Sequence, residues 1–156
     1  MSVMKELQLP VSVRWRGGRL TRAESRGKEP LQLATPPEFR GGLPGFWSPE
    51  DLLVAAVASC FELTLAAVAE RREAPLLDAT VTATGHMSRR DDGCFDFTVI
   101  ELDALLETVP GGEDAVRAAA AAAERRCLIK RALEVPVHVA VDVRTVARAH
   151  ADALPS

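Results

Sequence analysis

Residues 46–61, Phe46-Trp47-Ser48-Pro49-Glu50-Asp51-Leu52-Leu53-Val54-Ala55-Ala56-Val57-Ala58-Ser59-Cys60-Phe61, hold a helix start and, twelve positions later, a thiol. Ser48 is a good N-cap, Pro49 suits the first helical position, and the two acidic residues that follow complement the positive end of the helix dipole. Pro75 cannot continue a helix. The pattern therefore predicts one helix from Pro49 to about Glu73.

Apolar residues occupy nearly every face of this expected helix, which predicts burial on all sides. A chain this small would struggle to cover such a helix alone, so we expect a homodimer. Residues 52–69 are apolar enough to raise the question of a membrane span, but Ser59, Glu62 and Thr64 interrupt them. A buried central helix and no membrane association are therefore expected.

On both sides of this expected helix, apolar and polar residues alternate with the two-residue period of a β-strand. Strands are expected near residues 11–16, 20–25, 31–33, 77–83, 95–106 and 135–143. A second helix should start after Gly111-Gly112, and a short helical stretch should follow Cys127. In residues 95–106 the apolar positions switch from odd to even numbers, which predicts a bulge near Val99–Ile100. The order predicts an α+β fold, with antiparallel sheets packed on two main helices, in a single domain (1–143) followed by a tail (144–156).

Composition excludes several function classes. The 156 residues carry a net charge of −3 with a pI near 5.6, so no basic footprint for nucleic acid exists. The first ten residues lack the apolar region of a secretory signal. Three cysteines in a chain without an export signal indicate a reducing compartment, where a disulfide would be transient and catalytic. We expect a cytoplasmic protein.

Cys60 and Cys127 lie on two different expected helices, which suggests thiol redox chemistry, although a buried helical cysteine is more often a small apolar residue. Cys60 lies too far inside its helix for the dipole to lower its pKa, so a reactive thiolate needs a cation from another segment. Arg40 is the candidate, and Glu50 could hold its guanidinium in a bidentate pair. Glu50 is about 15 Å along the helix from Cys60, so the pair should serve the opposite subunit.

The other polar residues carry weaker signals. Cys94 lies at an expected turn and is interpreted as dispensable. His86, Asp91, Asp92 and Cys94 show no recurrent metal-ligand spacing, and Gly41-Gly42 lacks the lysine of a phosphate-binding loop. The sequence therefore predicts neither a metal nor another cofactor.

At these residues the chain resembles the OsmC/Ohr family of thiol-dependent hydroperoxide reductases. The resemblance covers about residues 10–143 and lies in three stretches: Thr35-Pro36-Pro37-Glu38-Phe39-Arg40-Gly41-Gly42, Ser48 to Leu53 with Ala58-Ser59-Cys60-Phe61, and Glu124-Arg125-Arg126-Cys127-Leu128-Ile129. It implies an intertwined homodimer with two interfacial sites. Cys60 then matches the peroxidatic cysteine, Cys127 the resolving one, and Arg40 with Glu50 the activating pair. Leu128 departs from the family, because peroxidase members often have proline there.

The resemblance implies that a hydroperoxide oxidises Cys60 to a sulfenic acid, that Cys127 condenses with it to a disulfide, and that a lipoyl-type dithiol reduces the pair. Two alternatives remain open at this point. The chain could be a non-peroxidase module that binds a small apolar or thiol ligand in the same dimer cleft, or a purely structural domain.

Overall fold

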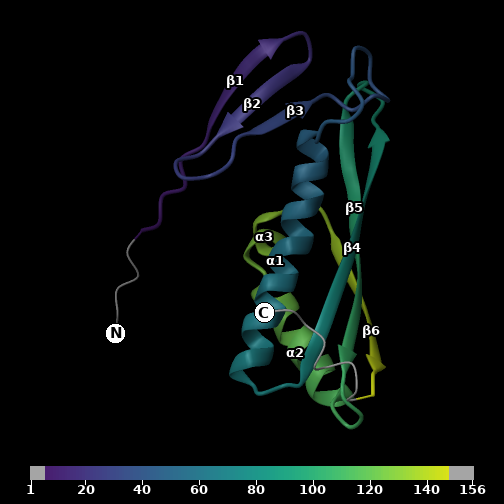
Figure 1. Cartoon of the computed structure of the whole chain (residues 1–156). Helices are drawn as coiled ribbons and strands as arrows, with labels where there is room; N and C mark the ends of the chain where they lie inside the picture. The colour runs from purple at the N-terminus through teal and green to yellow at the C-terminus, as the bar shows by residue number, and fades with distance from the viewer. Residues whose placement is uncertain (1–5, 148–156) are drawn as a thin grey trace. The chain divides into compact units, whose positions relative to one another are not determined.

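The computed structural model describes residues 6–147 and divides the chain into two compact units between Leu52 and Leu53 (Figure 1). The first unit is a three-stranded antiparallel sheet in the order β1-β2-β3. Its strands are β1 (Ser12–Gly17), β2 (Leu20–Glu24) and β3 (Leu31–Ala34). Gly17 and Gly18, both at positive φ, form the predicted turn of the β1–β2 hairpin.

Helix α1 (Pro49–Arg71) begins where the sequence predicts. The backbone N–H of Asp51 donates to the Ser48 hydroxyl (3.0 Å), and the N–H of Ser48 donates to the Asp51 carboxylate (2.9 Å). This reciprocal pair satisfies two N–H groups that the first helical turn leaves free, in the manner of a capping box.

The end of α1 is a Schellman turn. The N–H of Ala74 donates to the carbonyl of Ala69 (2.9 Å), and the N–H of Glu73 donates to the carbonyl of Glu70 (3.1 Å). Glu73 takes the left-handed conformation (φ 52°) that this turn requires, the only non-glycine among the described residues with positive φ. Pro75 follows at once, so α1 stops as its sequence predicts.

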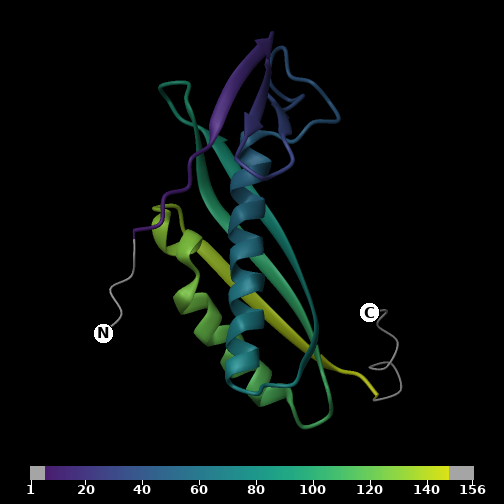
Figure 2. The same ribbon diagram turned by 60° about the vertical axis from the view of Figure 1, so that its left-hand side comes forward.

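The second unit contains a three-stranded sheet in the order β4-β5-β6, with α1 and α2 on the same face (Figure 2). The strands are β4 (Leu76–Arg89), β5 (Phe95–Thr108) and β6 (Val137–Thr145), and the helices between β5 and β6 are α2 (Glu113–Arg126) and α3 (Leu128–Ala132). The prediction of wholly antiparallel sheets is wrong here, because β5 and β6 pair in parallel. The α2–α3 segment is the helical crossover that a parallel pair needs.

The predicted change of phase in β5 is present, but the irregularity is displaced. His86 pairs with Val99 and Met87 pairs with Phe97, so Thr98 is the extra residue. The bulge therefore precedes the predicted position by one residue. Beyond it, Ile100 and alternate residues to Thr108 turn toward the core.

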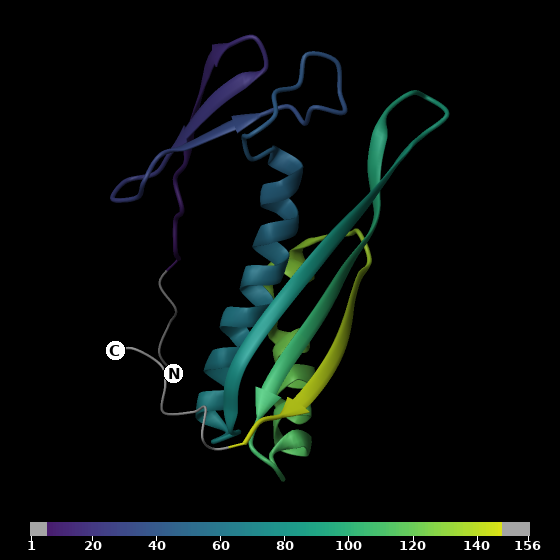
Figure 3. The same cartoon turned by 45° about the vertical axis from the view of Figure 1, so that its right-hand side comes forward.

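One apolar core fills the space between the sheet and the helices. It contains Val57, Phe61, Leu65 and Val68 of α1, alternate residues of β5 and the alanine face of α2. Gly85 permits close packing of α1 on β4, because an added Cβ would lie 2.7 Å from Val54 and 2.7 Å from the Phe97 ring. The opposite face of the sheet carries polar side chains, and Figure 3 shows that no helix covers it.

Helix α1 is not buried on all sides within one chain. It is long and apolar enough to cross a membrane by length and composition alone, a test that core helices of globular proteins also pass. Only 28% of its apolar window is buried, and Leu63 is 70% exposed. The single chain thus leaves a large apolar helix surface without cover.

The predicted tail begins later than expected, since β6 continues to Thr145, and most of it lies outside the described residues. Whether residues 1–143 act as one domain stays a prediction.

Replacing Glu73 by glycine is expected to raise the free energy of unfolding by about 0.5–1 kcal/mol. The substitution removes the steric cost of a side chain in the left-handed conformation, which exceeds the entropy that glycine loses on folding. Denaturant titration measures the change. Glu73→Ala, which keeps a Cβ, should stay within about 0.5 kcal/mol of the parent, and equal stabilisation by both variants would contradict this explanation.

Candidate functional site

The structure brings Cys60 and Cys127 into contact. Cys60 lies in the middle of α1 and is half-buried, whereas Cys127 is 1% exposed and belongs to the core cluster against which Cys60 packs. Each thiol shifts the pKa of the other, and no disulfide joins them. Residues that are 67 positions apart (127 − 60) therefore meet at one site.

Cys127 occupies the break between two helices. It is both the C-cap of α2 and the N-cap of α3, with an extended backbone (φ −60°, ψ 109°). The side chains of Glu124, near the end of α2, and Lys130, in α3, form an ion pair across this break. The break turns the first N–H groups of α3 toward the sulfur atoms.

The surroundings of Cys60 favour its thiolate. Burial raises the pKa of this thiol, but the N–H groups of Ile129 and Leu128, the Cys127 thiol and the Thr64 hydroxyl outweigh burial, and the resulting pKa lies below that of an ordinary thiol. The lowering comes from donors of α3 and from the neighbouring turn of α1, without any cation.

The opposite holds for Cys127. Burial raises its pKa, the N–H of Lys130 opposes this effect, and the negative charge of Cys60 raises the pKa further. No side-chain hydrogen bond of standard geometry caps α3, so the opposing N–H contact is a weak one. Cys60 is thus the first of the two to ionise, and Cys127 keeps its proton.

Thr64 is a site residue that the sequence reasoning missed. It lies four residues after Cys60 on α1, so both side chains lie on one face of the helix. Its hydroxyl helps to lower the pKa of Cys60. The spacing is a signal that could have pointed to it, whereas the contribution of the Leu128 and Ile129 backbone has no signature in side-chain identity.

Arg40 and Glu50 belong to the first unit and are not joined to each other. Arg40 is exposed, in the loop between β3 and α1, and Glu50 is in the first turn of α1. Glu50 Oε2 is the one side-chain oxygen or nitrogen, among the described residues, that is buried without a hydrogen-bond partner. The predicted Arg40–Glu50 pair is therefore absent from the single chain, and the roles of the two residues stay predictions.

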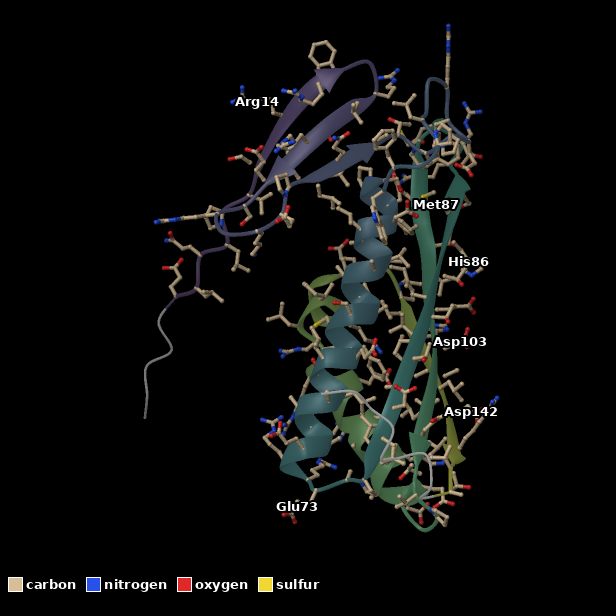
Figure 4. The ribbon with its side chains drawn as sticks, viewed as in Figure 1. Arg14, Glu73, His86, Met87, Asp103 and Asp142 are labelled. Atoms are coloured by element: carbon tan, nitrogen blue, oxygen red, sulfur yellow. The ribbon has the colours of Figure 1, made fainter. Side chains whose placement is uncertain are left out.

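The remaining candidates lie elsewhere. Cys94 is exposed in the turn between β4 and β5. His86 pairs with Glu101 (2.7 Å) on the outer face of the sheet, where Figure 4 shows it pointing away from the helices, as Asp103 and Asp142 also do. Across residues 6–147, no three histidine, cysteine or acidic side chains are placed to hold a metal ion.

The fold agrees with what comparison with family models finds. A family model described as "OsmC-like protein" matches residues 42–142, about two thirds of the chain. The chain belongs to the OsmC-like family. No curated protein matches it by sequence.

Solved structures of the family share this fold. An OsmC-like protein of unknown function from Vibrio cholerae is 18% identical, with a TM-score of 0.77 over 88% of this chain and 100% of that one. An organic hydroperoxide resistance protein OsmC from Legionella pneumophila is 27% identical, with a TM-score of 0.71 over 90% and 98%. An organic hydroperoxide resistance protein from Elizabethkingia anophelis is 23% identical, with a TM-score of 0.70 over 92% and 100%.

Thr64→Val is expected to raise the pKa of Cys60, because valine keeps the shape of threonine but donates no hydrogen bond to the thiolate. The rate at which a haloacetamide alkylates Cys60 should then reach its plateau at higher pH and be several-fold slower on the acid side. Thr64→Ser keeps the hydroxyl and is the matched control. Equal pH profiles for the valine and serine variants would show that the hydroxyl does not act on the sulfur.

Proposed function

We propose that this protein is a thiol-dependent peroxidase that reduces organic hydroperoxides. Cys60 is the peroxidatic residue: its thiolate attacks the distal peroxide oxygen and becomes a sulfenic acid while an alcohol leaves. Cys127 condenses with that sulfenic acid to form a disulfide and release water. A dithiol of the lipoyl type then returns both residues to thiols.

The observation that carries this proposal is the contact between two thiols whose pKa values are shifted in opposite directions. The pKa of Cys60 is lowered and that of its partner Cys127 is raised, so a nucleophile and a resolving thiol lie side by side. A structural cysteine pair would need no such asymmetry, since buried cysteines serve as small apolar residues. Free thiols that form a disulfide only during turnover suit a reducing, cytoplasmic setting.

Arg40 and Glu50 complete the site in this proposal, supplied by the second subunit of a homodimer. Glu50 Oε2 is buried and unpartnered, which is costly for a carboxylate unless a cation meets it. Arg40 is an exposed guanidinium in the same unit. The uncovered surface of α1 supports the dimer, as do exposed apolar side chains along β1 and the segment before it: Leu7, Leu9, Val11, Val13 and Trp15.

Cys60→Ser is expected to abolish consumption of an alkyl hydroperoxide in the presence of dihydrolipoamide, with a loss on the order of 10³-fold or more, because the nucleophile is gone. Cys94→Ser, an exposed cysteine away from the site, is the matched control and should keep near-parental turnover. Mass spectrometry of protein treated with one equivalent of peroxide should find a Cys60–Cys127 disulfide. Parental protein that binds small ligands but consumes no peroxide would instead indicate the binding module.

Mixed dimers test whether the site is shared. Cys60→Ser and Arg40→Ala homodimers should each be inactive, but a mixed dimer regains one complete site, with both cysteines from the arginine variant and the Arg40–Glu50 pair from the serine variant. Differently tagged subunits, refolded together and purified through both tags, should recover about half of the parental activity per dimer. Purified mixed dimers without activity would show that Arg40 does not act across the interface.

A further inference from the structure

The cysteine pair (Cys60 and Cys127) holds a proton as well as two sulfur atoms. Cys60 packs against the core cluster that contains Cys127. The pKa of Cys60 is lowered and that of Cys127 is raised, so Cys60 ionises first and the remaining thiol proton resides on Cys127. Cys127 is 1% exposed, so this proton does not exchange freely with bulk water. It lies where the peroxide reacts.

The proposed reaction creates a demand for such a proton. When the Cys60 thiolate attacks the distal oxygen of an alkyl hydroperoxide, that oxygen goes to sulfur with its hydrogen, and an alkoxide leaves. An alkoxide is a strong base that is costly to form in a partly buried site unless it is protonated as it leaves. The group that supplies the proton must already lie beside the Cys60 sulfur.

Few groups meet that requirement. The groups that lower the pKa of Cys60 are the N–H groups of Leu128 and Ile129, the Thr64 hydroxyl and the Cys127 thiol. Backbone amides and an alcohol hydroxyl hold their protons far more tightly than a thiol does. The Lys130 ammonium is engaged by Glu124 and is not among the groups that act on either sulfur. An arginine does not release its proton in proteins.

We propose that Cys127 is the general acid of the peroxide-reducing step, in addition to being the residue that forms the disulfide. This inference rests on the proposed peroxidase function. The Cys60 thiolate and ROOH give Cys60 sulfenic acid and an alkoxide, and the Cys127 thiol protonates the alkoxide to the alcohol ROH. The resulting Cys127 thiolate attacks the sulfenic sulfur and the disulfide forms, while the sulfenic oxygen takes up a proton from bulk solvent and leaves as water.

Transfer of the Cys127 proton makes disulfide formation follow peroxide reduction. Cys127 is a poor nucleophile while it keeps its proton, and it becomes a thiolate only when peroxide has been reduced. The resolving nucleophile is therefore generated in place, next to the sulfenic acid that it must attack. Two adjacent thiolates, which would repel each other, never need to coexist.

Single-turnover peroxide reduction on Cys127→Ala separates this role from disulfide formation, because a residue that acts only after sulfenic acid formation cannot change the first step. Protein is mixed with less than one equivalent of oxidant, and the rate is divided by the Cys60 thiolate fraction, measured by ultraviolet absorbance in the same variant. Two oxidants are compared. An alkyl hydroperoxide releases an alkoxide, whereas a peracid releases a weakly basic carboxylate that needs no proton.

We expect Cys127→Ala to slow the normalised reaction with the alkyl hydroperoxide by on the order of 10²-fold and to leave the peracid reaction within a few-fold of the parental rate. Cys127→Ser, which keeps the volume and a weaker acid, should lie between the two. Circular dichroism and the peracid rate itself report whether each variant is folded with a working Cys60.

Equal effects on both oxidants, or no effect on either, would overturn the general-acid role while leaving the peroxidase function intact. Parental protein that reacts with neither oxidant would overturn the proposed function, and the general-acid role with it. The two failures are thus distinguishable in one set of measurements.

Discussion

The contact between Cys60 and the start of α3 is the interaction on which the rest of the site depends. It requires that α2 end at Arg126 and that a new helix begin at Leu128, so that Cys127 and the N–H groups of Leu128 and Ile129 all face α1. A continuous helix through Cys127 would hide those N–H groups in its own hydrogen bonds. The Glu124–Lys130 ion pair, which joins residues on both sides of the break, holds this geometry. Such a pair adds little to the free energy of unfolding, so its contribution is to fix the position of α3 relative to α2.

Thiolate activation here differs from what the sequence suggests. From the sequence a cation is expected beside Cys60, because this residue is too deep in α1 for that helix dipole to act. The structure lowers the pKa of Cys60 within one unit, through neutral donors of α3 and the adjacent turn of α1. In the proposed peroxidase, a cation brought by Arg40 would then bind and polarise the peroxide, a role for which a charge is better suited than an amide. Activation of sulfur and recognition of substrate need not come from the same residues.

Much of the fold could be predicted from the sequence because its signals are local. Ser48 and Pro49 mark the start of α1, Pro75 marks its end, and alternating apolar residues mark β4, β5 and β6. The parallel pairing of β5 with β6 could not be predicted in this way, since side chains alternate identically in parallel and antiparallel strands. A phase change shows that a bulge exists, but not that Thr98 is the residue displaced. Thr64 and the amides of α3 were missed because their importance depends on a contact between distant segments.

The proposed homodimer would address two unfavourable features of the single chain. One chain leaves much of an apolar helix only partly covered and buries a Glu50 oxygen with no partner, and both features are unfavourable in isolation. A second subunit that covers α1 brings its own first helical turn, with Glu50, toward the middle of the covered helix if the two helices run antiparallel. Because Glu50 and Cys60 are about 15 Å apart along one helix, such crossing would place a carboxylate and its arginine beside a thiol in the proposed dimer. The separate chain would then hold a reactive sulfur without the residues that capture peroxide, so dimerisation would supply stability and substrate binding together.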